Sequence, residues 1–158
     1  MTQEDKELLL KDLCARLPYG VNVEYTFKVT DIETNAEEII TKPLFIYSIN
    51  TLDNMTVSGI DDEGDSWICF FEEIKPYLFP MSSMTHEQRK ELIAYAGYER
   101  REEDAGWHSE TYYYDLVGHE NCMFPDSSDI DWLNKNHFDY RGLIEKGLAI
   151  DATNKNIY

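Results

Sequence analysis

Four residues near the end of the sequence, Trp132, His137, Tyr140 and Arg141, carry side chains of the kinds that bind ligands. Aromatic rings with a few polar groups among them are typical of small-molecule pockets. At helical spacing Trp132 and His137 do not share one face, so the chain must turn a corner to bring the four together. They are our candidate binding residues, although a structural role, the packing of two helices onto a sheet, is the favoured interpretation.

Three further residues, His108, His119 and Cys122, have side chains that bind transition metals, and Cys69 could be a distant fourth ligand. Zinc sites usually show two tightly spaced ligand pairs, whereas only His119 and Cys122 are close here. We therefore expect ordinary surface histidines and a buried thiol, with no metal site. A metal-assisted hydrolase that uses His108, His119 and Cys122 is kept as an alternative.

An acidic stretch, Asp61-Asp62-Glu63-Gly64-Asp65, offers oxygen ligands of the kind that Ca²⁺ prefers. Its spacing does not match the twelve-residue EF-hand loop, and the bidentate glutamate at the end of that loop is missing. Asp and Gly dominate tight turns. The stretch therefore predicts a hairpin turn, and we expect no cofactor.

The sequence lacks the common motifs of catalysis and nucleotide binding: G-x-S-x-G, the P-loop, G-x-G-x-x-G and H-E-x-x-H. Cys14 falls on the apolar stripe of an expected helix, so we assign it to the core and not to a nucleophile. We assign no catalytic residue, and the sequence favours a protein that is not an enzyme.

The charge of the chain narrows the range of partners. With 31 acidic and 14 basic residues in 158, the formal net charge is −17. Such a field repels nucleic-acid phosphates and anionic membranes and favours cationic partners. Eleven Tyr and three Trp are suited to protein interfaces. We expect a protein partner, with no direct nucleic-acid binding and no membrane.

The cysteines and the first residues of the chain indicate a compartment. Cys14, Cys69 and Cys122 are odd in number and far apart, which favours a reducing environment over a disulfide framework. The charged opening MTQEDKELLLKDL resembles neither a signal peptide nor a membrane anchor, and no window has the length of apolar residues that spans a bilayer. We expect a cytoplasmic protein.

The elements that must position these residues follow from periodicity. Residues 1–17 predict a helix, and residues 21–30 alternate strictly between apolar and polar side chains, as in a strand with one wet face. Further strands are expected at 44–49, 55–60 and 66–71, with Ile60 facing inward. Half-wet strands are typical of antiparallel sheets. Residues 21–71 therefore predict a meander of four to five antiparallel strands.

The second half of the chain predicts helices. Pro76 and Pro80 place residues 72–80 outside the sheet, and Thr85 with Gln88 forms a capping box for a helix over 85–99. Residues 128–147 predict two short helices, the second capped by Asp139 and ended by Gly147. The expected fold is a single α+β domain over residues 1–158, with an antiparallel sheet, an N-terminal helix and short C-terminal helices.

Three blocks of the second half are similar to one protein family. IKPYLFPMSSMT, the helix that follows it and DWLNKNHFDYRGLIEKGLAID together resemble an uncharacterised family carried by prophages and mobile elements of gut Bacteroidales. The resemblance implies a bacterial or phage origin and a cytoplasmic setting. It implies no activity, substrate or catalytic residue.

Three functions are compatible with the sequence. The first is a small acidic protein-interaction or regulatory protein of phage or mobile-element origin, which the aromatic content and the charge favour. The second is an acidic mimic of nucleic acid that inhibits a protein with a basic groove, which the net charge alone favours. The third is the metal-assisted hydrolase described above.

Overall fold

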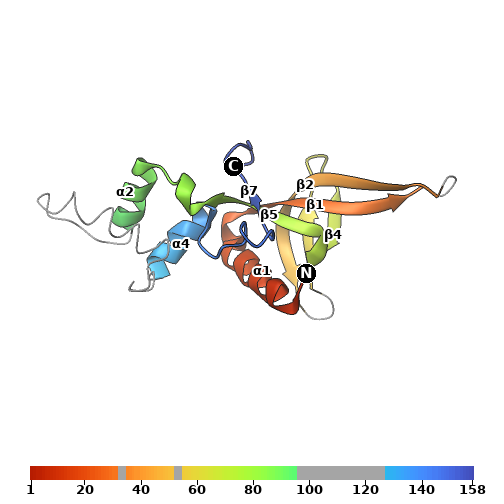
Figure 1. Cartoon of the computed structure of the whole chain (residues 1–158), viewed down its shortest axis with the longest axis horizontal. Coiled ribbons are helices and arrows are strands. Elements are labelled where there is room, and N and C mark those ends of the chain that lie inside the picture. Colours follow the sequence, from red (N-terminus) through yellow and green to blue (C-terminus); the bar gives the residue numbers. More distant parts are fainter. Residues whose placement is uncertain (32–34, 52–54, 96–126) are drawn as a thin grey trace, which may run out of the picture. The chain divides into compact units, whose positions relative to one another are not determined.

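The computed structural model describes residues 1–31, 35–51, 55–95 and 127–158 (Figure 1). These residues form two compact units, whereas the sequence predicts a single domain. Unit 1 comprises Met1–Leu78 and Leu143–Tyr158, and unit 2 comprises Phe79–Gly142. Each unit has an apolar core of its own, so each is described by itself. Helices and strands together give the α+β class that the sequence predicts.

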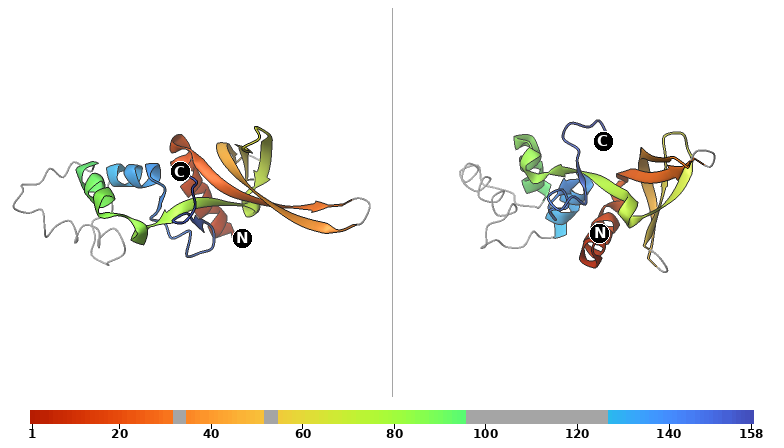
Figure 2. Two further views of the ribbon diagram at one scale, coloured as in Figure 1. Left: turned by 90° about the horizontal axis from the view of Figure 1, so that it is seen from above. Right: turned by 45° about the vertical axis from the view of Figure 1, so that its right-hand side comes forward.

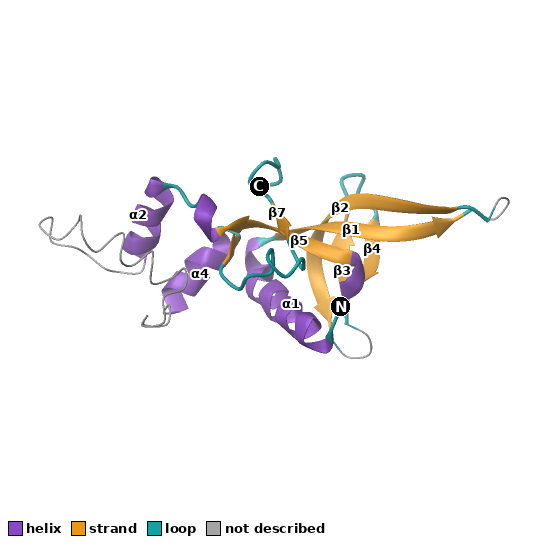
Figure 3. Cartoon of the chain, viewed as in Figure 1, coloured by secondary structure: helices purple, strands orange, loops and turns teal. Residues whose placement is uncertain are grey.

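Unit 1 is built on an antiparallel meander (Figure 3). Its strands are β1 (Val21–Thr30), β2 (Glu37–Asn50), β3 (Thr56–Ile60) and β4 (Ser66–Phe70), and each pairs antiparallel with the next along the chain. This confirms the predicted hairpin connections. β2 contains a bulge at Tyr47, because Ile46 lies opposite Gly59 whereas Ser48 lies opposite Ser58.

The sheet is larger than the sequence predicts, and it is mixed. β5 (Ile74–Pro80) pairs antiparallel with β1 and, within unit 1, in parallel with the two-residue strand β7 (Ile150–Asp151). The strand order is β4-β3-β2-β1-β5-β6, where β6 is Phe138–Asp139, with β7 on β5. The expectation that Pro76 and Pro80 place residues 72–80 outside the sheet is wrong, because both prolines lie in β5. A proline lacks only the N–H donor, so it can occupy a strand position where no ladder bond needs that donor.

The helix α1 (Gln3–Arg16) packs on one face of this sheet (Figure 2). Thr2 and Asp5 form a capping box at its start. The core of unit 1 contains residues of α1, of the first five strands and of the segment after unit 2, among them Leu9, Leu13, Val23, Leu44, Ile46, Val57, Phe71, Leu78, Leu143 and Leu148. The assignment of Cys14 to this core is wrong, because its side chain is exposed.

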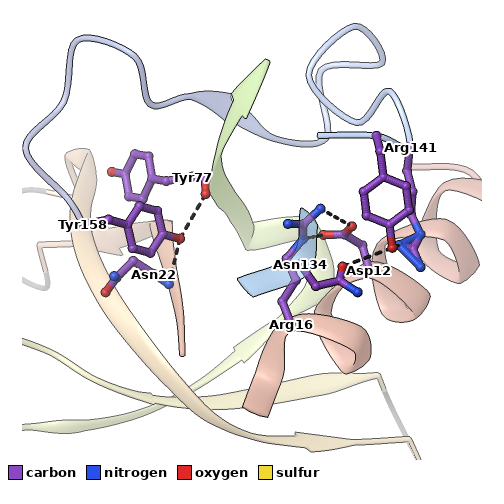
Figure 4. Close-up of polar contacts among 8 residues, drawn as sticks. Asp12, Arg16, Asn22, Tyr77, Asn134, Arg141 and Tyr158 are labelled. Carbon is purple, nitrogen blue, oxygen red and sulfur yellow. Dashed lines mark hydrogen bonds and ion pairs between the residues drawn. The ribbon is translucent and has the colours of Figure 1, made fainter. Parts of the chain in front are cut away.

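α1 also buries an ion pair that the sequence analysis missed. Arg16 Nε donates to Asp12 Oδ2 over 2.8 Å and Arg16 Nη2 to Asp12 Oδ1 over 3.0 Å, with both side chains fully buried (Figure 4). Their spacing of four residues puts them on one helical face. Two guanidinium nitrogens each donate to a different carboxylate oxygen, so the two buried charges compensate each other.

The last residue of unit 1 lies against two strands. The hydroxyl of Tyr158 accepts from the Asn22 amide at 3.4 Å and donates to the Tyr77 carbonyl at 3.0 Å (Figure 4). Val23 pairs with Pro76 in the ladder between β1 and β5. The phenol thus extends the contact between these strands by one residue pair beyond the ladder.

Unit 2 contains a short 3-10 turn at Met81–Ser83, α2 (His86–Tyr95), α4 (Ser127–Lys135) and β6 (Phe138–Asp139). The Thr85–Gln88 capping box is confirmed by bonds of 2.9 and 3.2 Å between each backbone amide and the other residue's side chain. β6 pairs in parallel with Phe79 and Pro80, the end of β5 that belongs to this unit. The continuation of α2 expected up to residue 99 lies outside the described residues.

The expectation of two helices over 128–147 is half wrong. α4 forms the first, but β6 and a series of turns replace the second. His137 and Gly142 adopt positive φ angles of 58° and 72°, which an α-helix cannot contain. Gly147 has a φ of 71°, in the left-handed region that the sequence predicts for it.

Candidate functional site

Of the predicted binding residues, Trp132 is a core residue of unit 2. Its side chain is 4% exposed and its ring stacks on Phe138, with centroids 5.7 Å apart and planes inclined by 9°. Met81, Met84, Leu92 and Leu133 complete the same cluster. This geometry is that of a packed core, in which stacked aromatic rings stabilise one another.

The other three predicted residues lie at the corner after α4. Tyr140 donates to Asn134 Oδ1 over 3.0 Å, and the guanidinium of Arg141 lies 4.4 Å from the centroid of the Tyr140 ring and donates to its hydroxyl (Figure 4). His137 turns the backbone, and its carbonyl accepts from the Phe79 amide at 2.9 Å. The structure therefore brings Tyr140 and Arg141 together, and it adds Asn134, which the sequence analysis did not name.

The metal-binding candidates His108, His119 and Cys122 lie outside the described residues, so the hydrolase alternative stays a prediction. Cys69, the distant fourth candidate, is buried in β4. Burial raises the pKa of the Cys69 thiol to about 11, and the charge of Glu73 acts in the same direction. A thiol in this environment is protonated at neutral pH and is a poor metal ligand.

The acidic stretch forms the predicted turn between β3 and β4. Asp61 Oδ1 accepts from the amides of Glu63 (3.2 Å) and Asp65 (2.8 Å), and Gly64 has a φ of 91°. Oδ2 accepts from Lys42 Nζ (2.7 Å) and from Trp67 Nε1 (2.8 Å). The carboxylates of Asp61, Glu63 and Asp65 lie within 4.8 Å of one another. Both oxygens of Asp61 are nonetheless engaged by the protein, which makes this a scaffold for the turn.

The environment of Asp61 connects this turn to the sheet. Its side chain is fully buried, and the bond from Lys42 holds the pKa of the carboxyl well below its usual range. The Lys42 ammonium also lies 4.3 Å from the centroid of the Trp67 ring, which packs on Tyr25 and Phe27. Through these contacts the start of β4 is fixed to β2 and β1 by both charge and aromatic packing.

The most unusual surface of unit 1 is on the face of the sheet opposite α1. Five large apolar side chains from β2, β3 and β4 are exposed there: Phe45 (44%), Tyr47 (52%), Ile60 (37%), Ile68 (74%) and Phe70 (49%). We call them the outer patch. Their alternating neighbours Leu44, Ile46, Val57 and Cys69 are buried in the core, as expected where successive side chains point to opposite faces.

Strand register makes the outer patch continuous. Phe45 lies directly opposite Ile60, and Ile68 lies opposite Ser58, diagonal to Ile60. Phe70 is two residues beyond Ile68 on the same face of β4. Residues at such positions are within reach of one another across a sheet. Phe45, Ile60, Ile68 and Phe70 therefore form one surface, and Tyr47 lies next to it in the bulge of β2.

The outer patch is not predicted from the sequence. The inward position predicted for Ile60 is wrong, and residues 44–49 (LFIYSI) are predicted only as a strand. A nearly continuous apolar run within an antiparallel meander was the available signal, because such strands normally keep one face polar. Apolar residues at both phases of the alternation indicate two apolar faces, and α1 covers only one of them.

Acidic residues flank the outer patch at both ends of β4. Asp62, Glu63 and Asp65 are exposed in the turn before the strand, and Glu72 and Glu73 follow it. Glu72 forms an ion pair with Lys6, and Glu73 accepts from the Phe70 amide at 2.9 Å. The apolar surface therefore has a negatively charged rim.

Comparisons of the chain with models of protein families, with curated proteins and with solved structures find no match. Within the described ranges, no helix combines the length and the apolar character that crossing a bilayer requires.

Proposed function

We propose that this chain is a protein-interaction protein that binds a basic partner protein through the outer patch. The observation that carries the proposal is the exposure of five large apolar side chains on one face of a three-stranded region. Contiguous exposed apolar surface with a polar rim is the mark of a protein interface. Aromatic residues such as Phe45, Tyr47 and Phe70 are the ones that contribute most to binding when a partner buries them.

Charge supports a basic partner. The chain carries a net charge of −17, and the acidic residues at both ends of β4 lie beside the patch. Opposite charge around an apolar centre accelerates association and excludes partners of like charge. The phage or mobile-element origin is a further part of the proposal, and it is supported by the resemblance of the second half of the chain to that family.

A second copy of the chain fits the patch less well. Two copies that pack patch to patch place their acidic rims near each other, where like charges repel. A basic protein removes this repulsion and buries the same apolar area. We therefore commit to a different, basic protein as the occupant.

Crosslinking at one patch position tests the proposal. A photoreactive amino acid replaces Ile68 in one protein and Ile39 in another, and each is irradiated in a lysate of a gut Bacteroidales strain. Both isoleucines are exposed, at 74% and 65%, but Ile39 lies about 20 Å along β2 from Phe45. We expect a protein with a basic surface to crosslink at position 68 and not at position 39.

Two substitutions make the same test quantitative. We expect Ile68→Asp to reduce capture of that partner by about tenfold or more, because it places a charge in the centre of the interface, whereas Ile39→Asp leaves capture unchanged. Circular dichroism confirms that both variants fold. Equal capture by Ile68→Asp and the unchanged protein, or equal crosslinking at the two positions, overturns the proposal.

A further inference from the structure

On the side away from β3, β4 has no strand partner among the described residues. β4 is the first strand in the order β4-β3-β2-β1-β5-β6, and among the described strands only β3 pairs with it. An edge strand presents unpaired N–H and C=O groups that can pair with another chain. Its sequence, SWICF, contains neither the proline nor the charged residue with which edge strands usually prevent such pairing.

We propose that the partner binds as an extended segment that pairs with β4 and adds a strand to the sheet of unit 1. This inference rests on the proposed function and specifies its mode of binding. Strand addition obtains affinity from main-chain hydrogen bonds and specificity from alternate side chains. The segment's alternate side chains lie beside Ile68 on the outer patch, so they are apolar.

The contacts of β4 limit the length of the added strand. The amide of Phe70 already donates to the carboxylate of Glu73, over 2.9 Å. That N–H is therefore engaged within the chain, and the partner pairs with Ser66–Cys69. At the other end, the contact between Trp67 and Asp61 holds the beginning of the strand in place, so the edge is preorganised before binding.

The acidic residues around β4 determine which kind of partner this edge can bind. In antiparallel pairing of two copies, the Asp62–Asp65 turn of one copy faces Glu72 and Glu73 of the other; in parallel pairing, turn faces turn. Either arrangement places like charges together, which opposes association. A segment with basic residues on both sides of its apolar core meets negative charge at each end of β4. The occupant is therefore a basic-flanked extended segment of another protein.

Synthetic peptides test this inference directly. The probe is Lys-Lys-Ile-Thr-Val-Thr-Ile-Lys-Lys, and its first control replaces the four lysines with glutamates. We expect the lysine peptide to bind, and the glutamate peptide to bind with an affinity at least about tenfold lower. Ile68→Asp weakens binding of the lysine peptide by about tenfold, and Ile39→Asp leaves it unchanged.

Two peptides methylated at backbone amides distinguish strand addition from docking on the face. One peptide is methylated at its odd-numbered amides and the other at its even-numbered amides, the two phases of methylation. Because successive N–H groups point to opposite edges of a strand, each peptide loses the hydrogen-bond donors of one edge only. We expect one phase to weaken binding by about tenfold and the other to leave it unchanged. Hydrogen exchange of the free-edge amides of Ser66–Cys69 slows on binding.

The outcomes separate this inference from the proposed function. Equal effects of the two methylation phases, or no binding of the lysine peptide up to about 1 mM, overturn strand addition, while the Ile68-dependent crosslink still supports the proposed function. Loss of that crosslink overturns the proposed function. A dimer that Ile68→Asp dissociates in sedimentation experiments overturns both, because the occupant is then a second copy.

Discussion

The indole nitrogen of Trp67 donates to the carboxylate of Asp61 over 2.8 Å, and this bond ties the start of β4 to the turn that precedes it. Lys42 on β2 donates to the same oxygen over 2.7 Å. One buried carboxylate thus connects β2, the turn and β4. The position of the edge strand, and with it the outer patch, depends on this residue.

Asp61→Asn is expected to lower the midpoint of urea unfolding and to alter its pH dependence. Because the Lys42 bond holds the pKa of Asp61 below its ordinary value of 3.8, the unfolded state takes up a proton at higher pH than the folded state does. The stabilisation from the charged carboxylate is therefore complete above about pH 5 and is lost as pH falls below about 4. Urea midpoints of both proteins, measured from about pH 6 down to about pH 3, check this. A difference in midpoint that does not change with pH would falsify the role given to the charge.

Three phenols, those of Tyr25, Tyr77 and Tyr158, are expected to titrate late in alkali. Burial raises the pKa of Tyr25, Tyr77 and Tyr158 to about 12, against an ordinary value of 10.0. Because the folded pKa is raised, their contribution to stability is complete below pH 10 and is lost as pH rises towards 12. Spectrophotometric titration of tyrosinate should show a late step that is smaller in Tyr158→Phe. Titration of all eleven tyrosines in one step near pH 10 would contradict this.

The two described cysteines are expected to differ in reactivity. Cys14 is exposed, whereas Cys69 is buried with its pKa raised to about 11 from an ordinary 9.0. Two pKa units correspond to about a hundredfold less thiolate at neutral pH, and the thiolate is the reactive species. Alkylation followed by peptide mass spectrometry should label Cys14 rapidly in the native protein. Labelling of Cys69 should require urea, and equal rates at the two sites would rule out the buried position.

Replacement of Trp132 is expected to destabilise unit 2 and not merely to weaken a ligand site. Trp132→Ala removes a ring that stacks on Phe138 in the core, at a cost of about 3–5 kcal/mol in the free energy of unfolding. Trp132→Phe keeps an aromatic ring there and should cost less. Urea unfolding followed by circular dichroism, with hydrogen exchange of α4, measures both. A fully stable Trp132→Ala protein would favour the binding role instead.

Local patterns in the sequence predicted local structure well. The strict alternation of residues 21–30 corresponds to the bounds of β1, Val21–Thr30. The Thr85–Gln88 capping box and the turn at Asp61 were likewise readable, because each depends on residues within four positions of one another. The spacing of Asp12 and Arg16 belongs to the same class of signal, although burial of that pair depends on what α1 packs against.

The features that sequence reasoning missed depend on distant residues. Asp139 has the character of a helix cap, but it lies in β6 opposite Pro80, a strand pairing across 59 positions for which no local pattern exists. Pro76 lies in a strand opposite Val23, a pairing across 53 positions. The outer patch could be predicted only by knowing which face of the sheet α1 covers. In each case long-range packing overrides the local preference.

The bulge at Tyr47 has a consequence for how β2 can vary in length. Because Tyr47 has no opposite residue, Ile46 and Ile49 both turn towards the core although three positions separate them. Deletion of Tyr47 would leave a regular strand in which both isoleucines keep their orientation. Deletion of any single residue from 44 to 46 would instead disturb the inward positions of the strand. Length variation among related chains should therefore be concentrated at this one position.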